Sequence, residues 1–289
     1  MQSKGYVVIG FRKLVKRVEE LGSLDQVSRP TVAFVKRVTA SDPVKNVLSG
    51  TWLGHQLHPV LTDLPIGAWT MATALDLTAG RRADEAARRL VGLGVLTAVP
   101  AAAAGASDWS DTYGGEQRVG IVHARANSTG TLLQIGAWFA RRRGNRATGV
   151  ALSATGLGIT LGAAYLGGYL SFTRGVGVNH TAFQSNVTDW TDVAAVSALE
   201  DDKPLRVTAG GVPVMLVRHN GELRALSATC THAGGPLDEG RLVDGCVRCP
   251  WHSSTFRLDD GAVVRGPATA DEPTWDIKVE GDRVLVREG

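Results

Sequence analysis

The chain has few cysteines and few aromatic residues. Only Cys230, Cys246 and Cys249 occur among 289 residues, so the sequence carries no disulfide framework of the kind that staples small secreted domains. Aromatic residues make up 6 % of the chain and do not cluster within its basic stretches, so no nucleic-acid-binding face is expected. The N-terminal region has no short apolar core followed by a small-residue cleavage site, so we expect no removable signal peptide.

Charge is absent from one long stretch. Residues 149–172 contain no charged side chain and are long enough to cross a hydrocarbon layer of about 30 Å. Three further apolar blocks, with short charge-rich connectors between them, cover residues 59–79, 89–107 and 119–140. Because Asp63, Asp76 and Arg125 lie in or near these blocks, a soluble helical bundle is the alternative. The pattern predicts that residues 51–175 form an all-α, four-helix transmembrane bundle in the lipid bilayer.

The first 50 residues are basic and amphipathic, with Phe, Leu and Val at helical spacings between cations. Two interpretations stay open for this segment. In one, the segment attaches to an anionic membrane surface. In the other, it is a solvated helix that packs on its own protein.

Residues 187–289 have a different pattern. Two β-rich runs flank Asn220-Gly221, a pair that favours a tight hairpin turn between strands. The last strands repeat this plan around a Glu-Gly-Asp turn. We therefore expect a small all-β domain after the helical bundle.

Four side chains in this β domain have metal-ligand spacing. Cys230 and His232 lie in one Gly- and Pro-rich loop, and Cys249 and His252 lie in a second one, giving C-x-H-x16-C-x2-H. Zinc fingers usually keep each ligand type together, whereas here each loop supplies one thiolate and one imidazole. Mixed loops favour a binuclear centre. Cys246 makes a Cys-x2-Cys with Cys249, but we interpret it as a small buried strand residue.

At these residues the sequence resembles the Rieske family, over about the last hundred residues. The resemblance implies a [2Fe-2S] cluster with Cys230 and Cys249 on its inner iron and His232 and His252 on its outer iron. Gly234 and Gly235 would let backbone N–H groups approach the sulfides, and Pro267 looks like part of the family's third loop, which covers the cluster.

The departures from one branch of this family are informative. Rieske proteins of the respiratory and photosynthetic complexes carry an extra disulfide, whose positions here hold Gly235 and Trp251. Their second loop also offers Ser and Tyr hydroxyls, whereas here Ser254 remains and Phe256 replaces the Tyr. Fewer donors predict a reduction potential low in the Rieske range. The resemblance is closer to the Rieske ferredoxins that serve oxygenases and reductases.

The helical part resembles an uncharacterised family of small bacterial four-helix membrane proteins, through "HQLHPVLTDLPIGAW", "GASDWSD" and "HARANS". Alternating helices would bring the polar residues of these motifs to one end of the bundle: His55, His58, Asp63, Asp108, Asp111, His123 and Arg125. Three interpretations stay open. In the first, His58 and His123 bind a b-type haem, with Asp63 and Asp108 nearby. In the second, these residues line a quinone pocket. In the third, they form a structural cluster of helix caps and ion pairs.

Together these patterns predict a membrane-anchored one-electron transfer protein with a redox partner protein, an electron-transfer component rather than a catalyst alone. The alternatives are a redox or iron sensor and a ferredoxin component that feeds an oxygenase. A terminal oxygenase is disfavoured because no mononuclear-iron motif of two histidines and a carboxylate follows the Rieske unit. The arginine-rich connectors favour a Rieske domain outside the cell membrane, but the missing disulfide and the basic N-terminal segment favour the cytoplasmic side, which we predict.

Overall fold

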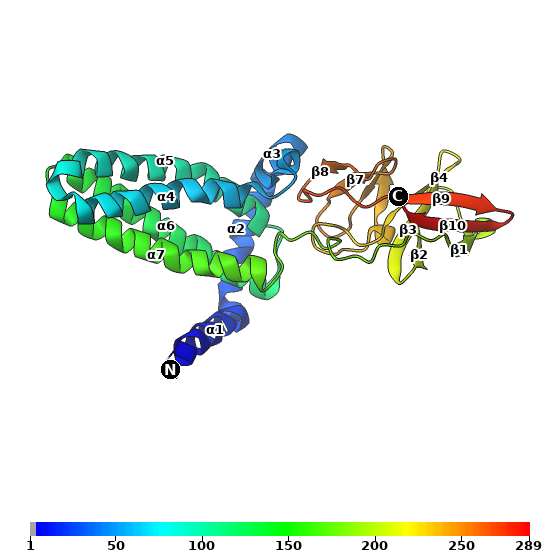
Figure 1. Cartoon of the computed structure of the whole chain (residues 1–289), viewed down its shortest axis with the longest axis horizontal. Coiled ribbons are helices and arrows are strands. Elements are labelled where there is room, and N and C mark those ends of the chain that lie inside the picture. The colour runs from blue at the N-terminus through cyan, green and yellow to red at the C-terminus, as the bar shows by residue number, and fades with distance from the viewer. Residues whose placement is uncertain (1–3) are drawn as a thin grey trace. The chain divides into compact units, whose positions relative to one another are not determined.

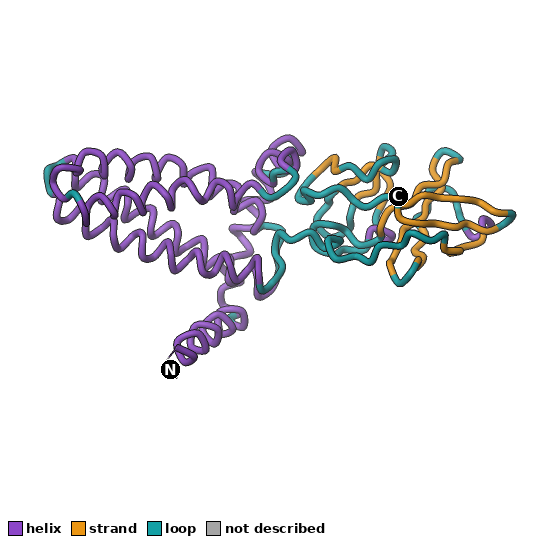
Figure 2. Tube along the Cα trace, in the orientation of Figure 1, coloured by secondary structure: helices purple, strands orange, loops and turns teal. Residues whose placement is uncertain are grey.

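The computed structural model describes residues 4–289, with side chains from Gly10 onward. The chain folds into two compact units. The helical unit contains the residues up to Ala40 together with Leu57–Val176, and the β unit contains Ser41–Gln56 and Gly177–Gly289. Figure 2 shows the helical and strand-rich parts of the chain. A helical N-terminal region followed by a small all-β domain confirms that part of the predicted fold class.

Four long helices form the body of the helical unit: α4 (Leu57–Thr78), α5 (Asp84–Trp109), α6 (Gly114–Arg142) and α7 (Arg146–Phe172). They lie side by side and cover the four apolar blocks of the sequence (Figure 1). Both α4 and α6 pack against α5 and α7, so α4 and α6 face each other across the bundle. Two of the four, Gly80–Trp109 with its preceding 3-10 turn and Arg146–Phe172, are long and apolar enough to cross a membrane.

The interior of this bundle contains small and polar side chains. Ala72, Ala87, Ala137 and Val91 form a fully buried apolar cluster. Gln134 on α6 is also fully buried, and its Nε2 donates to the Ser153 carbonyl at 3.0 Å. Large apolar side chains lie outside instead, with Leu77, Leu96, Val99 and Leu132 each at least 66 % exposed.

A buried charge network closes one end of the bundle. Arg141 on α6 has no exposed side-chain surface and forms ion pairs with Asp76 on α4 and with Asp84, the latter at 2.6 Å. Arg146 lies 3.3 Å from Asp76. Because a buried guanidinium needs an acidic partner, these connector residues have a structural reason for their charge.

The basic N-terminal segment forms α1 (Lys4–Glu20) and α2 (Asp25–Val38). It packs against its own bundle. Arg118 of α6 donates to the Asp25 carboxylate at 2.7 Å and to the Glu19 carbonyl at 2.7 Å, and the Tyr169 hydroxyl donates to the Glu19 carboxylate at 3.0 Å. These contacts favour the interpretation in which the segment packs on its own protein.

The β unit contains ten strands in three antiparallel sheets. One sheet has the order β1-β10-β9 (Thr191–Ala195, Arg283–Glu288, Trp275–Glu280), and a second has the order β2-β3-β4 (Leu205–Ala209, Val212–His219, Glu222–Ser227). The third has the order β5-β6-β7-β8 (Arg241–Val243, Cys246–Arg248, Thr255–Arg257, Val263–Arg265). The predicted hairpin is present, with Asn220 and Gly221 at positive φ between β3 and β4.

One helix of the β unit comes from far upstream in the chain. The short helix α3 (Asp42–Ser49) and the turn Thr51–Leu53 belong to this unit, whereas the sequence pattern placed residues up to 50 in the basic segment and residues from 51 in the bundle. Gly50 and Gly54 adopt left-handed conformations with φ near 80°, which end α3 and redirect the chain toward α4. Residues 41–56 are thus structurally separate from the amphipathic helices that precede them.

Candidate metal centre

The two Cys/His loops follow strands of two different sheets. Cys230 and His232 come after β4, while Cys249 and His252 lie in the tight connection between β6 and β7. Both cysteines belong to one buried core cluster, together with Leu237, Val247 and Phe256. The strands therefore bring two segments that lie nearly twenty residues apart in the sequence to one place.

The four predicted ligands meet at this place. The His232 and His252 rings lie edge to face with their centroids 4.8 Å apart. The thiols of Cys230 and Cys249 are hydrogen-bonded to each other, and each has at most 2 % of its surface exposed. Two thiols on the inside and two imidazoles beside them reproduce the arrangement that a mixed-ligand binuclear cluster requires.

Backbone hydrogen bonds fix both loops. In the first loop the Cys230 N–H donates to Gly235 O, and the Gly234 N–H donates back to Cys230 O, both at 2.8 Å. In the second loop the Cys249 N–H donates to Ser254 O at 2.8 Å, and the Ser253 N–H donates to Cys249 O at 3.1 Å. Each cysteine predicted as a ligand is thus held at both its N–H and its carbonyl group.

The two glycines of the first loop have separate roles. Gly234 has φ 74°, a conformation that disfavours other residues. At Gly235 a Cβ would lie 3.0 Å from Cys249 Sγ and 3.0 Å from the Trp251 ring, so a side chain would crowd the ligand thiol. The structure therefore supplies a packing reason for the second glycine as well as a conformational reason for the first.

A third loop covers the site. The Gly266–Pro267 peptide bond is cis, and Pro267 and Ala268 are buried. The Ser254 hydroxyl accepts a hydrogen bond from the Ala268 N–H at 3.0 Å and has no exposed surface, which leaves its own proton available to a neighbouring acceptor. Phe256 is fully buried in the core cluster that also contains both ligand cysteines.

The helix α3 holds this third loop from the other side. Asn46 donates from Nδ2 to Val264 O at 3.0 Å and accepts at Oδ1 from the Gly266 N–H at 2.9 Å. Arg265 forms an ion pair with Asp42 at 2.7 Å. No pattern in residues 41–49 indicates this contact, because it joins segments more than two hundred residues apart.

Electrostatics distinguish the two thiols. A hydrogen bond from the Cys230 thiol, together with the backbone N–H groups of Trp251 and His252, lowers the pKa of Cys249 to about 7. The pKa of Cys230 is raised, first by the adjacent Cys249 and then by burial, although the His232 N–H acts in the opposite direction. The backbone N–H groups that point at both sulfurs are those that stabilise thiolate ligands.

The imidazole of His232 fits a metal ligand. Its Nδ1 is buried and has no hydrogen-bond partner among the residues that the structure describes, which is costly for a nitrogen that binds nothing. Burial first, and then the charges of His252, Lys45 and His180, lower the pKa of His232 to about 3, so the ring is neutral as metal binding requires. The residues present therefore fit a [2Fe-2S] cluster.

Three side chains near the site were not predicted from the sequence. Lys45 on α3 is only 3 % exposed and places positive charge near His232. His180 donates its backbone N–H to Thr231 O at 3.0 Å. Glu272 is 2 % exposed, accepts from the Thr231 N–H at 3.1 Å, and has a pKa raised well above its ordinary value by burial.

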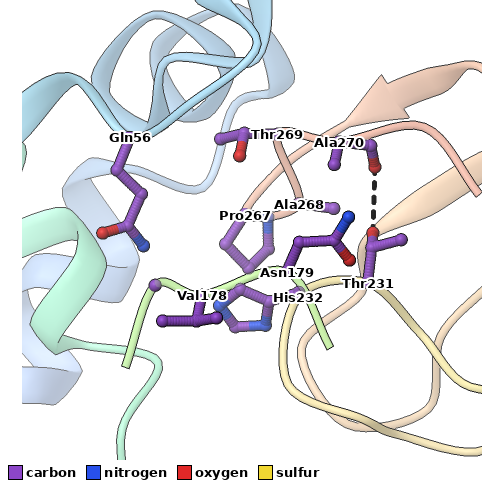
Figure 3. Close-up of a pocket in the computed structure, with 10 residues that line it drawn as sticks. Gln56, Val178, Asn179, Thr231, His232, Pro267, Ala268, Thr269 and Ala270 are labelled. Atoms are coloured by element: carbon purple, nitrogen blue, oxygen red, sulfur yellow. Dashed lines mark hydrogen bonds between the residues drawn. The ribbon is translucent and has the colours of Figure 1, made fainter. Parts of the chain in front are cut away.

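A hollow lies beside His232, bordered by Gln56, Asn179, Thr231 and Pro267 (Figure 3). Its volume of about 20 Å³ holds a single water molecule.

The third cysteine takes no part in this arrangement. Cys246 lies in β6, paired with Val243 and Arg257, and burial raises its pKa. Its Sγ lies 3.7 Å from the Asp244 carbonyl. This placement agrees with a buried strand residue.

The polar residues predicted for the bundle end are only partly brought together. His58 and His123 approach each other, with ring centroids 6.4 Å apart. Asp108 is buried near the end of α5, but Asp63 and Arg125 are exposed and form no ion pair with each other. His55 is exposed and lies outside the helical unit.

Comparison with known proteins identifies two domains. Residues 189–278 match the family described as Rieske [2Fe-2S] domain, and residues 54–180 match the family described as predicted membrane protein (DUF2231). Human apoptosis-inducing factor 3 is 38 % identical over 95 residues, which are 33 % of this chain and 16 % of that protein. The chain thus spans about a sixth of that relative.

Other similar proteins match over nearly their whole length. The ferredoxin component of the naphthalene 1,2-dioxygenase system of Pseudomonas aeruginosa is 30 % identical over 97 residues, 34 % of this chain and 93 % of that protein. The solved ferredoxin of carbazole 1,9a-dioxygenase from Nocardioides aromaticivorans IC177 is 28 % identical over 35 % of this chain and all of its own, with a TM-score of 0.34. Through residues 189–278 the chain therefore belongs to the Rieske [2Fe-2S] family, and its helical residues 54–180 match the DUF2231 family model.

Proposed function

We propose that this protein is a membrane-anchored one-electron carrier that exchanges electrons with a redox partner protein. The observation that carries the proposal is the convergence of Cys230, His232, Cys249 and His252 in two loops under a third. When bound there, a [2Fe-2S] cluster takes up and releases a single electron. The similarity to ferredoxin components of dioxygenase systems supports a partner of the oxygenase or reductase class.

The partner would dock near the histidine ligands. Trp251 is 52 % exposed and lies next to His252, with ring centroids 6.4 Å apart. An exposed tryptophan is a frequent anchor of protein interfaces. The chain's own contribution to electron transfer is then to bury the thiolates, hold the two partly exposed histidines beside them and present an aromatic side chain to the partner.

We also propose that α4 to α7 span a lipid bilayer four times. The shortest of them, α4, has 22 residues, about 33 Å at 1.5 Å per residue, which is enough to cross about 30 Å of hydrocarbon. In the apolar windows of Gly80–Trp109 and α7, only 28 % and 33 % of the window is buried, so most of their apolar side chains need another apolar environment. Small residues inside and large apolar residues outside are typical of helices that pack in lipid.

The connector arginines and the free thiols bear on the side of the membrane. Arg141 is fully buried against Asp76, and Arg88 and Arg89 both bind Glu85, so several connector arginines have a local structural role. The three thiols form no disulfide. We place the Rieske domain in the cytoplasm. Protease added to intact spheroplasts should leave that domain whole and degrade it only after lysis, and cleavage before lysis would reverse this topology.

The function is tested on the detergent-purified protein. It should contain two irons and two sulfides per chain in the β unit, show an EPR signal of low average g after dithionite reduction, and lose that signal in His252→Ala. Trp251→Ala should slow electron transfer with the partner while the midpoint potential stays unchanged. One zinc per chain without sulfide would end the proposal, and a cluster that changes redox state but passes electrons to no partner would favour a sensor.

A further inference from the structure

The helical unit holds two histidines whose rings are fixed in the same way. His58 on α4 lies with Nδ1 at 2.8 Å from the Ala101 carbonyl of α5, and His123 on α6 lies with Nδ1 at 2.8 Å from the Ala163 carbonyl of α7. A carbonyl only accepts, so each Nδ1 carries the proton and each Nε2 carries the lone pair. This orientation, with one ring nitrogen donating to a backbone carbonyl, is the usual one for a histidine that binds a metal through the other.

The match between the two histidines is part of an internal repeat. Trp69 and Gln134 follow His58 and His123 by the same number of residues, and each is buried. Trp69 donates to the Val91 carbonyl at 3.3 Å, as Gln134 donates to Ser153.

The second helix of each hairpin continues this correspondence. Ala101 follows Val91 by as many residues as Ala163 follows Ser153. The hairpins α4–α5 and α6–α7 are therefore built on one plan, and the two histidines occupy equivalent positions across the bundle.

Glycines give each ring its space at matching positions, four residues after the accepting alanines. A Cβ at Gly105 would lie 2.6 Å from His58 Cε1, and a Cβ at Gly167 would lie 3.2 Å from His123 Cε1. Ala104, next to Gly105, and Ala163, whose carbonyl lies 2.8 Å from His123 Nδ1, are almost fully buried. At Gly105 of α5 and Gly167 of α7 the missing Cβ thus leaves room for the two imidazole rings.

The spacing of the rings is compatible with two imidazoles that bind one metal from opposite sides. A metal–imidazole bond of about 2.0–2.1 Å plus roughly 1.1 Å from nitrogen to ring centre puts two imidazoles on opposite sides of one metal about 6 Å apart. The observed centroids are 6.4 Å apart, with the ring planes at 82°. In the described part of the helical unit, no group of three or more His, Cys, Asp or Glu side chains is placed to hold a metal ion. A metal bound by these two nitrogens must bring its other ligands with it, as an iron porphyrin does.

We propose that His58 and His123 are the two axial ligands of a b-type haem inside the helical unit. All three cysteines lie in the Rieske domain, so the helical unit has no thiol to attach a haem covalently. Cofactor sites between facing helices are a common use of bundle cores. Asn127 donates to His123 Nε2 at 3.1 Å and to the His123 carbonyl at 3.2 Å, so binding requires that its amide give up the first of these contacts. The site is independent of the cluster and goes beyond the proposed function.

The experiment uses the full chain, expressed with a haem precursor and purified in detergent. The pyridine haemochrome should give one haem per chain, and the ferric form should be six-coordinate and low-spin. Because the ring planes are nearly perpendicular, its EPR signal should be of the highly anisotropic type rather than the rhombic type of parallel imidazoles. The same haem should be present in His252→Ala, which removes the cluster signal, so failure of this inference and failure of the proposed function are distinguishable.

Matched variants decide which residues bind the haem. His58→Gln and His123→Gln keep a side-chain N–H for the Ala101 and Ala163 carbonyls but should lose the six-coordinate spectrum, whereas His55→Gln, outside the helical unit, should leave it unchanged. Circular dichroism checks that the helices remain. The inference is overturned if the wild-type protein takes up no haem from added hemin. In that case, Gln variants that lose only thermal stability would indicate a structural role for the histidines, and Gln variants that lose a co-purifying quinone would indicate a quinone pocket. An unchanged low-spin spectrum in either Gln variant also overturns it.

Discussion

Asn46 should stabilise the Rieske cluster from a helix that lies outside the Rieske sequence. Its amide makes two hydrogen bonds to the third loop, one to Val264 O and one from the Gly266 N–H. Each such bond contributes about 1 kcal/mol net, so Asn46→Ala should weaken closure of this loop by about 2 kcal/mol. At 1.4 kcal/mol per tenfold change, the fraction of molecules with the loop open should rise about 30-fold.

The assay is the rate at which a chelator bleaches the visible absorption of the oxidised cluster. If iron is lost from the open state and the loop recloses faster than iron leaves, the bleaching rate follows the open fraction. Asn46→Asp keeps the acceptor for Gly266 but loses the donor to Val264, so its rate should be intermediate. Asp42→Asn weakens only an ion pair whose carboxylate is 59 % exposed, worth at most about 1 kcal/mol, and should raise the rate less than tenfold. Equal bleaching of Asn46→Ala and wild type would refute the role of α3, and equal rates in Asn46→Ala and Asp42→Asn would show that the helix acts as a whole.

Four further predictions concern single residues around the cluster. Lys45→Met removes a buried positive charge and should lower the midpoint potential, by about 40 mV if the charge contributes about 1 kcal/mol, and an unchanged redox titration would contradict this. Cys246→Ser should keep iron content and EPR signal, because the thiol lies outside the ligand set, whereas loss of the cluster in a folded protein would make it a ligand. Phe256→Tyr should raise the midpoint potential if its hydroxyl reaches a sulfur, and no change in a folded variant would remove that argument. Burial raises the pKa of Glu272, so its contribution to the free energy of unfolding is complete below about pH 4.5 and is lost as the pH rises through the raised pKa. The melting temperature of Glu272→Gln relative to wild type should therefore be higher at pH 8 than at pH 5. Equal differences in melting temperature at both pH values would show that the carboxyl does not titrate in this range.

The sequence alone predicts a mixed Cys/His cluster site. The mixed loops at Cys230 and Cys249 can be identified because metal ligation restricts residue type and spacing within short segments, and such restrictions survive in a linear pattern. The helices could be anticipated for a similar reason, since a long apolar stretch must satisfy its backbone hydrogen bonds internally.

Only the tertiary structure decided what surrounds these patterns. The contact of Asn46 with the third loop, the burial of Lys45 and Glu272 near the ligands, and the equivalence of His58 and His123 join residues that lie far apart in the chain. The bundle motif also suggested Asp63 as a neighbour of these histidines, but α4 turns that carboxylate outward. The sequence pattern indicates which residues lie close together along one helix or loop. Contacts between distant segments depend in addition on which face of each helix packs against its neighbour, and that orientation is set by the packing of the small-residue faces.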